Sequence, residues 1–203
     1  MTTKTLHWSK PSAEIMNDSG DSIARIAEHD IMSISAQWSE ENTGSTLIVP
    51  CGPHSGTDPE PSEDLLAQWS PDSWEPFNTQ AQVIKQLAAA SSTELIILPG
   101  AGGRLSDAIC TASWAHTHQE FGLLIDPVGW LTPSMMTDLS DHLIRFTSLC
   151  QEINSIWGVV IRSVQEDTAG HLVHAPIGEG LISDELLDQT LRTIPTPRLI
   201  ECK

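Results

Sequence analysis

Three charged residues follow apolar runs of the sequence, in positions where they could take part in chemistry. Asp126 comes after FGLLI, Arg162 after IWGVVI and Glu201 after RLI. Carboxylate oxygens at strand ends can bind a hard divalent metal or move protons, whereas a guanidinium at the end of an apolar strand requires an anionic partner. The structural alternatives stay open, because Asp126 could cap a turn and Glu201 could be a solvated acid. Arg162 could also lie between the two carboxylates as a fixed cation.

Three further residues are candidates for contacts with a ligand. His54 follows the apolar run TLIVP within a loop, and Trp130 comes shortly after Asp126, where an indole could line the mouth of a ligand site. Glu179 lies between two glycines just before a helix. The backbone freedom of glycine predicts a turn there, which favours a structural role for Glu179 over that of a catalytic acid.

Charge and composition narrow the classes of partner. The chain has 203 residues, which predicts a single domain over 1–203, and its formal net charge is −17. Such a surface repels phosphate backbones and anionic lipid, so we expect neither nucleic acid nor membrane as a partner. No apolar run approaches the roughly 18–20 residues that span a bilayer, and the four cysteines are far apart. These features predict a cytoplasmic protein with reduced thiols.

Short apolar runs alternate with segments of helical spacing along most of the chain. Continuous apolar strands separated by helices are typical of parallel strands that are covered on both faces. The predicted strands lie at 5–9, 34–39, 46–52, 93–100, 121–127, 156–164 and 198–201, with a possible eighth at 171–174. The predicted helices lie near 18–29 and at 78–90, 103–118, 134–153 and 183–194. The polar stretch 54–77 is too long for an ordinary connector and predicts a functional loop or a short-helix excursion.

Seven or eight parallel strands permit either a closed barrel or an open doubly wound sheet. An open sheet that binds a dinucleotide normally has a glycine-rich turn after its first strand, and SKPSAEIM has none. PGAGGR at 99–104 does not fit the GxGxxG pattern. The sequence therefore favours an α/β fold of the (β/α) TIM-barrel-like kind, small or partly degenerate.

Residues 78–203 resemble the xylose-isomerase-like superfamily of sugar phosphate isomerases and epimerases, also called AP-endonuclease-2-like TIM barrels. The resemblance is carried by NTQAQVIKQLAAASSTELIILPG, FGLLIDPVGW, IWGVVIRSV and the closing segment HAPIGEGLISDELLDQTLRTIPTPRLIE. The closing segment, with a glycine–acid–glycine turn, a helix and a last strand ending in glutamate, is the most specific of the four.

The resemblance implies a divalent metal, Mg, Mn, Co or Zn, held at the strand ends by two glutamates, an aspartate and a histidine. Such an ion assists proton or hydride transfer on a sugar or polyol by stabilising the charge that develops on its oxygens. Asp126 and Glu201 match two of these ligands. Leu98 stands where the family has its other glutamate, and Arg162 stands where it has the histidine. Replacement ligands would have to come from loops, such as His54 or His174.

Three functions follow from these residues. The first is a sugar isomerase or epimerase with Asp126, Arg162 and Glu201 in its site. The second is a barrel that has lost the metal site and acts as a binding or structural protein, as the departures at Leu98 and Arg162 suggest. The third, a metal-dependent phosphodiesterase or DNA-repair nuclease, is disfavoured by the net charge and by the missing histidines.

Overall fold

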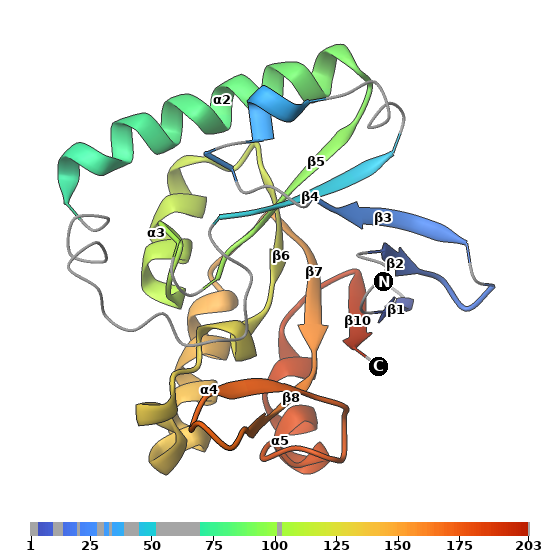
Figure 1. Ribbon diagram of the computed structural model, residues 1–203, viewed down its shortest axis with the longest axis vertical. Coiled ribbons are helices and arrows are strands. Elements are labelled where there is room, and N and C mark those ends of the chain that lie inside the picture. The colour runs from blue at the N-terminus through green and yellow to red at the C-terminus, as the bar shows by residue number, and fades with distance from the viewer. Residues whose placement is uncertain are drawn as a thin grey trace.

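Eight strands close into a barrel in the computed structural model, which describes residues 4–9, 14–19, 21–27, 31–32, 34–38, 45–51, 70–100 and 103–202 (Figure 1). Around the barrel the strands follow the order β1-β10-β7-β6-β5-β4-β3-β2, and β2 returns to β1. Their bounds are β1 Lys4–Ser9, β2 Glu14–Met16, β3 Ser22–Ile26, β4 Thr46–Pro50, β5 Glu94–Leu98, β6 Gly122–Ile125, β7 Ile156–Ile161 and β10 Arg198–Cys202.

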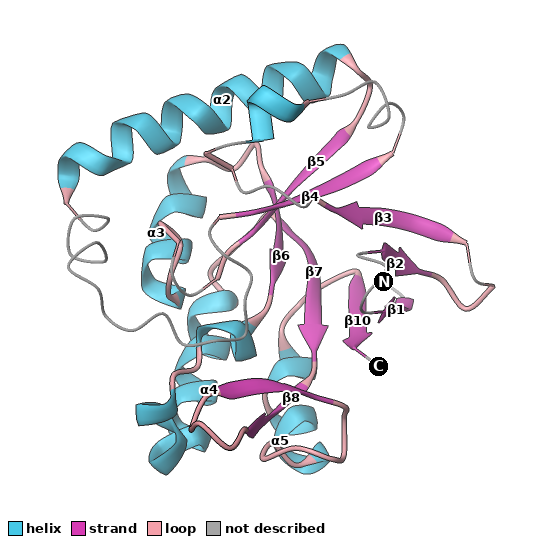
Figure 2. Ribbon diagram, in the orientation of Figure 1, coloured by secondary structure: helices cyan, strands magenta, loops and turns pink. Residues whose placement is uncertain are grey.

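The helices lie outside the barrel and are unevenly distributed (Figure 2). The α-helices are α2 Trp74–Ala90, α3 Ala108–Thr117, α4 Leu139–Cys150 and α5 Asp184–Gln189. The 3-10 helices are η1 Ile34–Gln37, η3 Pro71–Ser73, η4 Pro127–Trp130, η5 Pro133–Asp138 and η6 Leu191–Thr193. A separate antiparallel hairpin of β8 Ser163–Glu166 and β9 Leu172–Ala175 follows β7. In the described part of the chain, no helix is long and apolar enough to cross a membrane.

The prediction of a closed α/β barrel is confirmed, but the barrel is mixed. Seven strands are parallel, and β2 runs antiparallel to its neighbours β1 and β3. The helix predicted near 18–29 is wrong, because a turn and β3 occupy its described residues. Asn17 causes this turn, since its side-chain oxygen accepts hydrogen bonds from the backbone N–H groups of Ser19 and Asp21 at 3.0 and 2.9 Å. Such side-chain bonds compete with helix formation.

Two other predicted strands take different forms. Residues 34–37 form the 3-10 helix η1 instead of a barrel strand. The possible strand at 171–174 exists as β9, yet it pairs with β8 outside the barrel. The predicted strand 156–164 accordingly divides into β7, which stays in the barrel, and β8, which leaves it. Of the predicted loop 54–77, residues 54–69 lie outside the described residues, and 74–77 begin α2.

Alternate residues of the barrel strands pack into two separate apolar clusters. On β5, Ile96 and Leu98 point into the barrel, whereas Ile97 packs outward against the helices. This is the two-residue period of a strand. The inner cluster consists of Leu6, Ile15, Ala24, Ile26, Ile48, Ile96, Leu98, Leu124, Trp157, Val160, Ile200 and Cys202. The outer cluster between barrel and helices contains the large aromatic residues Phe77, Trp114, Phe121, Trp130 and Phe146.

Candidate functional site

Asp126 and Arg162 meet at the C-terminal end of the barrel. They follow β6 and β7, which are adjacent parallel strands. Leu124 and Val160 belong to the inner cluster, and Asp126 and Arg162 share their strand parity two residues later. Both charged side chains therefore point into the mouth of the barrel, the face on which TIM-barrel enzymes build their active sites.

The two side chains form a buried bidentate ion pair. Nε of Arg162 lies 2.9 Å from Oδ2 and 3.2 Å from Oδ1 of Asp126, and Nη2 lies 2.9 Å from Oδ2. The side chains of Asp126 and Arg162 are only 1% and 8% exposed. This geometry is the strong form of a charge-assisted hydrogen bond, since the planar guanidinium matches the carboxylate.

The local field keeps Arg162 charged. Burial by itself lowers the pKa of a guanidinium, because an apolar environment disfavours its charged form. The Asp126 carboxylate more than offsets this effect, so the pKa of Arg162 lies above its ordinary value. Cys202, buried at the end of β10, adds a smaller electrostatic contribution in the same direction. Arg162 is therefore a permanent cation at the barrel mouth.

The turn after β6 also holds Asp126 in place. Oδ1 accepts a hydrogen bond of 3.0 Å from the backbone N–H of Gly129, so Asp126 caps η4 while it pairs with Arg162. A Cβ atom at residue 129 would lie 3.0 Å from Oδ2 of Asp126 and 3.3 Å from Nη2 of Arg162. Glycine thus leaves room for the ion pair. The Asp-Pro-x-Gly spacing was the available sequence signal for Gly129, and our sequence reasoning missed it.

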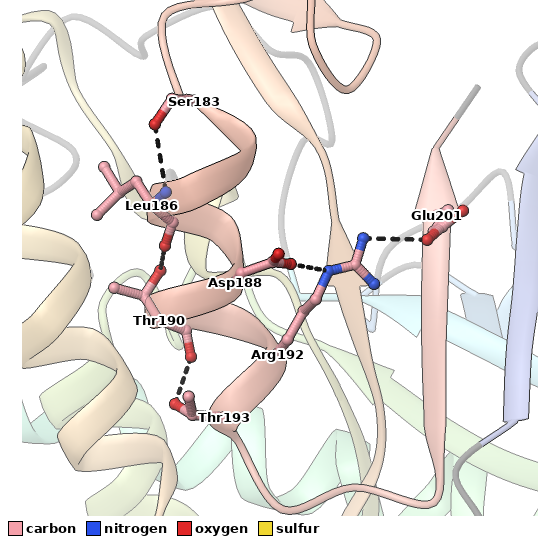
Figure 3. A network of polar contacts seen from close by, with 7 residues as sticks. All are labelled: Ser183, Leu186, Asp188, Thr190, Arg192, Thr193 and Glu201. Carbon is pink, nitrogen blue, oxygen red and sulfur yellow. Dashed lines mark hydrogen bonds and ion pairs between the residues drawn. The ribbon is translucent and has the colours of Figure 1, made fainter.

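Glu201 lies on the other face of the barrel wall. It shares strand parity with Leu199, which packs against the outer cluster, whereas Ile200 points inward. Its Oε1 accepts a hydrogen bond of 3.2 Å from Nη2 of Arg192, and Nε of Arg192 lies 2.6 Å from Asp188 (Figure 3). Glu201 therefore connects β10 to α5 and η6, and the structure does not bring it to Asp126.

The structure does not place the candidate Trp130 beside Asp126 and Arg162 either. Trp130 is buried in the outer cluster, where its Nε1 donates to the carbonyl oxygen of Leu105 at 3.4 Å and its ring packs edge-on against Phe146. It contributes to the core between barrel and helices, so it does not line the barrel mouth. His54 lies outside the described residues. The pair of Asp126 and Arg162 is the part of the predicted site that the structure assembles.

The glycine–acid–glycine turn, Gly178 to Gly180, packs against strand β8. Gly178 has a φ of +84°, the left-handed region that favours glycine. At Gly180 a Cβ atom would lie 2.6 Å from the carbonyl oxygen of Val164 and would overlap the side chain of Ser163. Ser163 in turn accepts a hydrogen bond of 3.0 Å from the backbone N–H of Ile182. Glu179 is exposed in this turn, which seats the segment before α5 against β8.

The described residues around Asp126 do not fit a divalent metal. Arg162 occupies both carboxylate oxygens, and its positive charge opposes a second cation at the same place. Within the described ranges no group of three or more His, Cys, Asp or Glu side chains could hold a metal ion. The resemblance would require several hard oxygen or nitrogen ligands around one point.

No family model matches this sequence, and no curated protein matches it either. The resemblance to the xylose-isomerase-like superfamily therefore stays a prediction from the four stretches that carry it.

Proposed function

We propose that this protein is a divergent, TIM-barrel-like binding protein of the xylose-isomerase-like kind, in which a fixed arginine replaces the metal. The observation that carries this proposal is the buried bidentate pair of Arg162 and Asp126. Arg162 lies at the position where the resemblance implies a histidine ligand, and it neutralises the carboxylate that would otherwise bind the ion. The proposed ligand at the mouth is a small sugar or polyol, the class that the resemblance implies.

The chemistry of the pair supports binding over metal-assisted isomerisation. A metal promotes isomerisation by holding two substrate oxygens and stabilising the charge that develops on them. A guanidinium can donate hydrogen bonds to hydroxyl groups, but Nε and Nη2 of Arg162 are directed to a buried carboxylate that already balances its charge. The pair therefore forms a fixed polar surface at the barrel mouth. It has little net charge with which to stabilise the charge that develops in a transition state.

Metal titration tests this proposal. After chelation, the melting temperatures of the wild type, Asp126→Asn and Glu201→Gln are measured with Mg, Mn, Co or Zn added. A resident ion at a hundredfold excess over its Kd would stabilise the folded state by about 2.7 kcal/mol, so its effect would be easy to detect. We expect that none of these metals raises the melting temperature of the wild type by binding at Asp126, because Arg162 occupies the carboxylate. The wild type and Asp126→Asn should therefore respond to each metal in the same way.

The control and the opposite outcome are both informative. Glu201→Gln removes a carboxylate from the outer face, so it should behave as the wild type toward every metal. If Mn or Co raises the melting temperature of the wild type and Asp126→Asn removes that increase, the binding proposal fails. The protein would then be tested as a sugar or polyol isomerase with Asp126 as a metal ligand.

A further inference from the structure

Arg162 has one guanidinium nitrogen that the ion pair does not use. Nε donates to Oδ2 and Oδ1 of Asp126 at 2.9 and 3.2 Å, and Nη2 lies 2.9 Å from Oδ2. In the described part of the chain, no hydrogen bond or ion pair involves Nη1. This nitrogen carries two of the five N–H groups of the guanidinium. Two donors of a side chain that is only 8% exposed are therefore left over after the pair with Asp126 has formed.

Nη1 of Arg162 lies at the surface of the barrel mouth. The inward-facing residues below the pair, Leu124, Val160 and Ile200, have apolar side chains, so they offer Nη1 no acceptor. Among the described residues, the buried side-chain nitrogens and oxygens that lack a hydrogen bond include none of Arg162. The two N–H groups of Nη1 therefore belong to the exposed part of the side chain, where water or a ligand can accept hydrogen bonds from them.

Asp126 fixes the orientation of these two donors. Its carboxylate is 1% exposed and accepts a hydrogen bond of 3.0 Å from the backbone N–H of Gly129. Because the guanidinium is planar, its contacts at Nε and Nη2 determine where Nη1 lies. A ligand that accepts from Nη1 therefore meets donors that are already oriented, and its binding costs little rotamer freedom of Arg162.

The charge of the pair favours an uncharged ligand. The Asp126 carboxylate balances the Arg162 guanidinium, and the chain as a whole has a net charge of −17. An anion at Nη1 would be repelled by the Asp126 carboxylate and by the net charge of the protein, which together oppose its attraction to Arg162. A cation would face the guanidinium itself. Oxygen atoms without a formal charge can accept from Nη1 and meet neither repulsion.

We propose that the barrel mouth binds an uncharged polyol and that Nη1 of Arg162 donates its two hydrogen bonds to neighbouring oxygens of this ligand. Asp126 is a positioning residue, which orients Nη1 and makes the site neutral. This inference rests on the proposed function, because the polyol class comes from there. It adds the atom that contacts the ligand and a selection against sugar acids and amino sugars.

Titration of the whole protein with matched sugars tests the selection by charge. The probes are glucose, galactose and mannose, each with its uronate and its 2-amino derivative, and saturation-transfer NMR measures their binding. We expect at least one neutral sugar to bind saturably, and its two charged derivatives to bind at least about tenfold more weakly. If none of these probes binds, the proposed function and this inference both fail. If a charged derivative binds as tightly as its neutral sugar, the proposed function stands and the selection by charge is wrong.

Asp126→Asn gives a readout that a purely structural role of Asp126 would not change. The amide keeps an oxygen that can accept from Nε of Arg162, but it removes the negative charge and leaves the site positive. We therefore expect this variant to bind the uronate more tightly than the neutral sugar, which reverses the preference of the wild type. The same order of preference in the variant and the wild type would contradict the role given to Asp126.

Arg162→Lys and a matched control locate the contact. Lysine keeps the positive charge, but one ammonium group cannot contact Asp126 and also reach the place of Nη1, so the neutral sugar should bind at least about tenfold more weakly. Arg192→Lys alters an arginine that also contacts two acids, Asp188 and Glu201, and it should bind as the wild type does. Melting temperatures establish that each variant is folded. Unchanged affinity in folded Arg162→Lys would overturn the assignment of Nη1 while the proposed function stands.

Discussion

Asp126→Ala is expected to lower the free energy of unfolding by about 3–5 kcal/mol, the usual cost of leaving one member of a buried ion pair without its partner. Arg162 would keep its charge at 8% exposure with no anion beside it. The backbone N–H of Gly129 would also lose its side-chain acceptor and keep only the backbone carbonyl oxygen of residue 126. Urea denaturation of wild type and variant, monitored by circular dichroism, measures the difference.

Asp188→Ala is the matched control for this prediction. It also removes an aspartate from an arginine, but the Asp188 side chain is 67% exposed, and Arg192 keeps its second partner Glu201. Because solvent screens such a pair, we expect a loss below about 1 kcal/mol.

The double variant Asp126→Leu with Arg162→Met should recover most of the loss seen in Asp126→Ala, because it leaves no uncompensated charge. If the double variant lost as much stability as Asp126→Leu and Arg162→Met lose together when each is made alone, this account would be contradicted.

Gly180→Ala is expected to destabilise the protein by about 3 kcal/mol, at the upper end of the usual range for overpacking. The added Cβ atom would lie 2.6 Å from a backbone carbonyl oxygen, that of Val164, which cannot rotate away as a side chain would. Relieving this clash requires the turn to move off β8. The move would break the hydrogen bond of 2.7 Å from the N–H of Leu181 to the same carbonyl.

Gly100→Ala serves as the comparison for Gly180→Ala. No atom of the described residues lies within 4 Å of a Cβ built at Gly100, and its φ is not in the left-handed region. We expect this variant to be as stable as the wild type to within about 0.5 kcal/mol. Thermal unfolding of both variants measures the contrast. A Gly180→Ala protein that melts with the wild type would show that the turn is not seated against β8 as described.

The sequence by itself predicted most of the strands and the closed α/β barrel. The runs 95–98, 122–125 and 156–161 contain no polar side chain, because both faces of a covered parallel strand are buried. The same patterns predicted that Arg162 needs an anionic partner, since a charge at the end of such a strand is costly alone. Each of these conclusions depends on local spacing, which a single sequence displays directly.

Only the tertiary structure decided which face each strand presents to the barrel interior. Strand parity shows that the side chains of Leu199 and Glu201 lie on the same face of β10. Closure of the barrel makes this the outer face, where Glu201 contacts Arg192. Strand β3 replaces the predicted helix because the short pattern SIARI fits either period, and pairing with β2 and β4 selects the strand. The pair of Asp126 and Arg162 forms because the barrel places β6 beside β7, although α4 separates these strands in the sequence. Long-range closure of this kind leaves no local signal in the sequence.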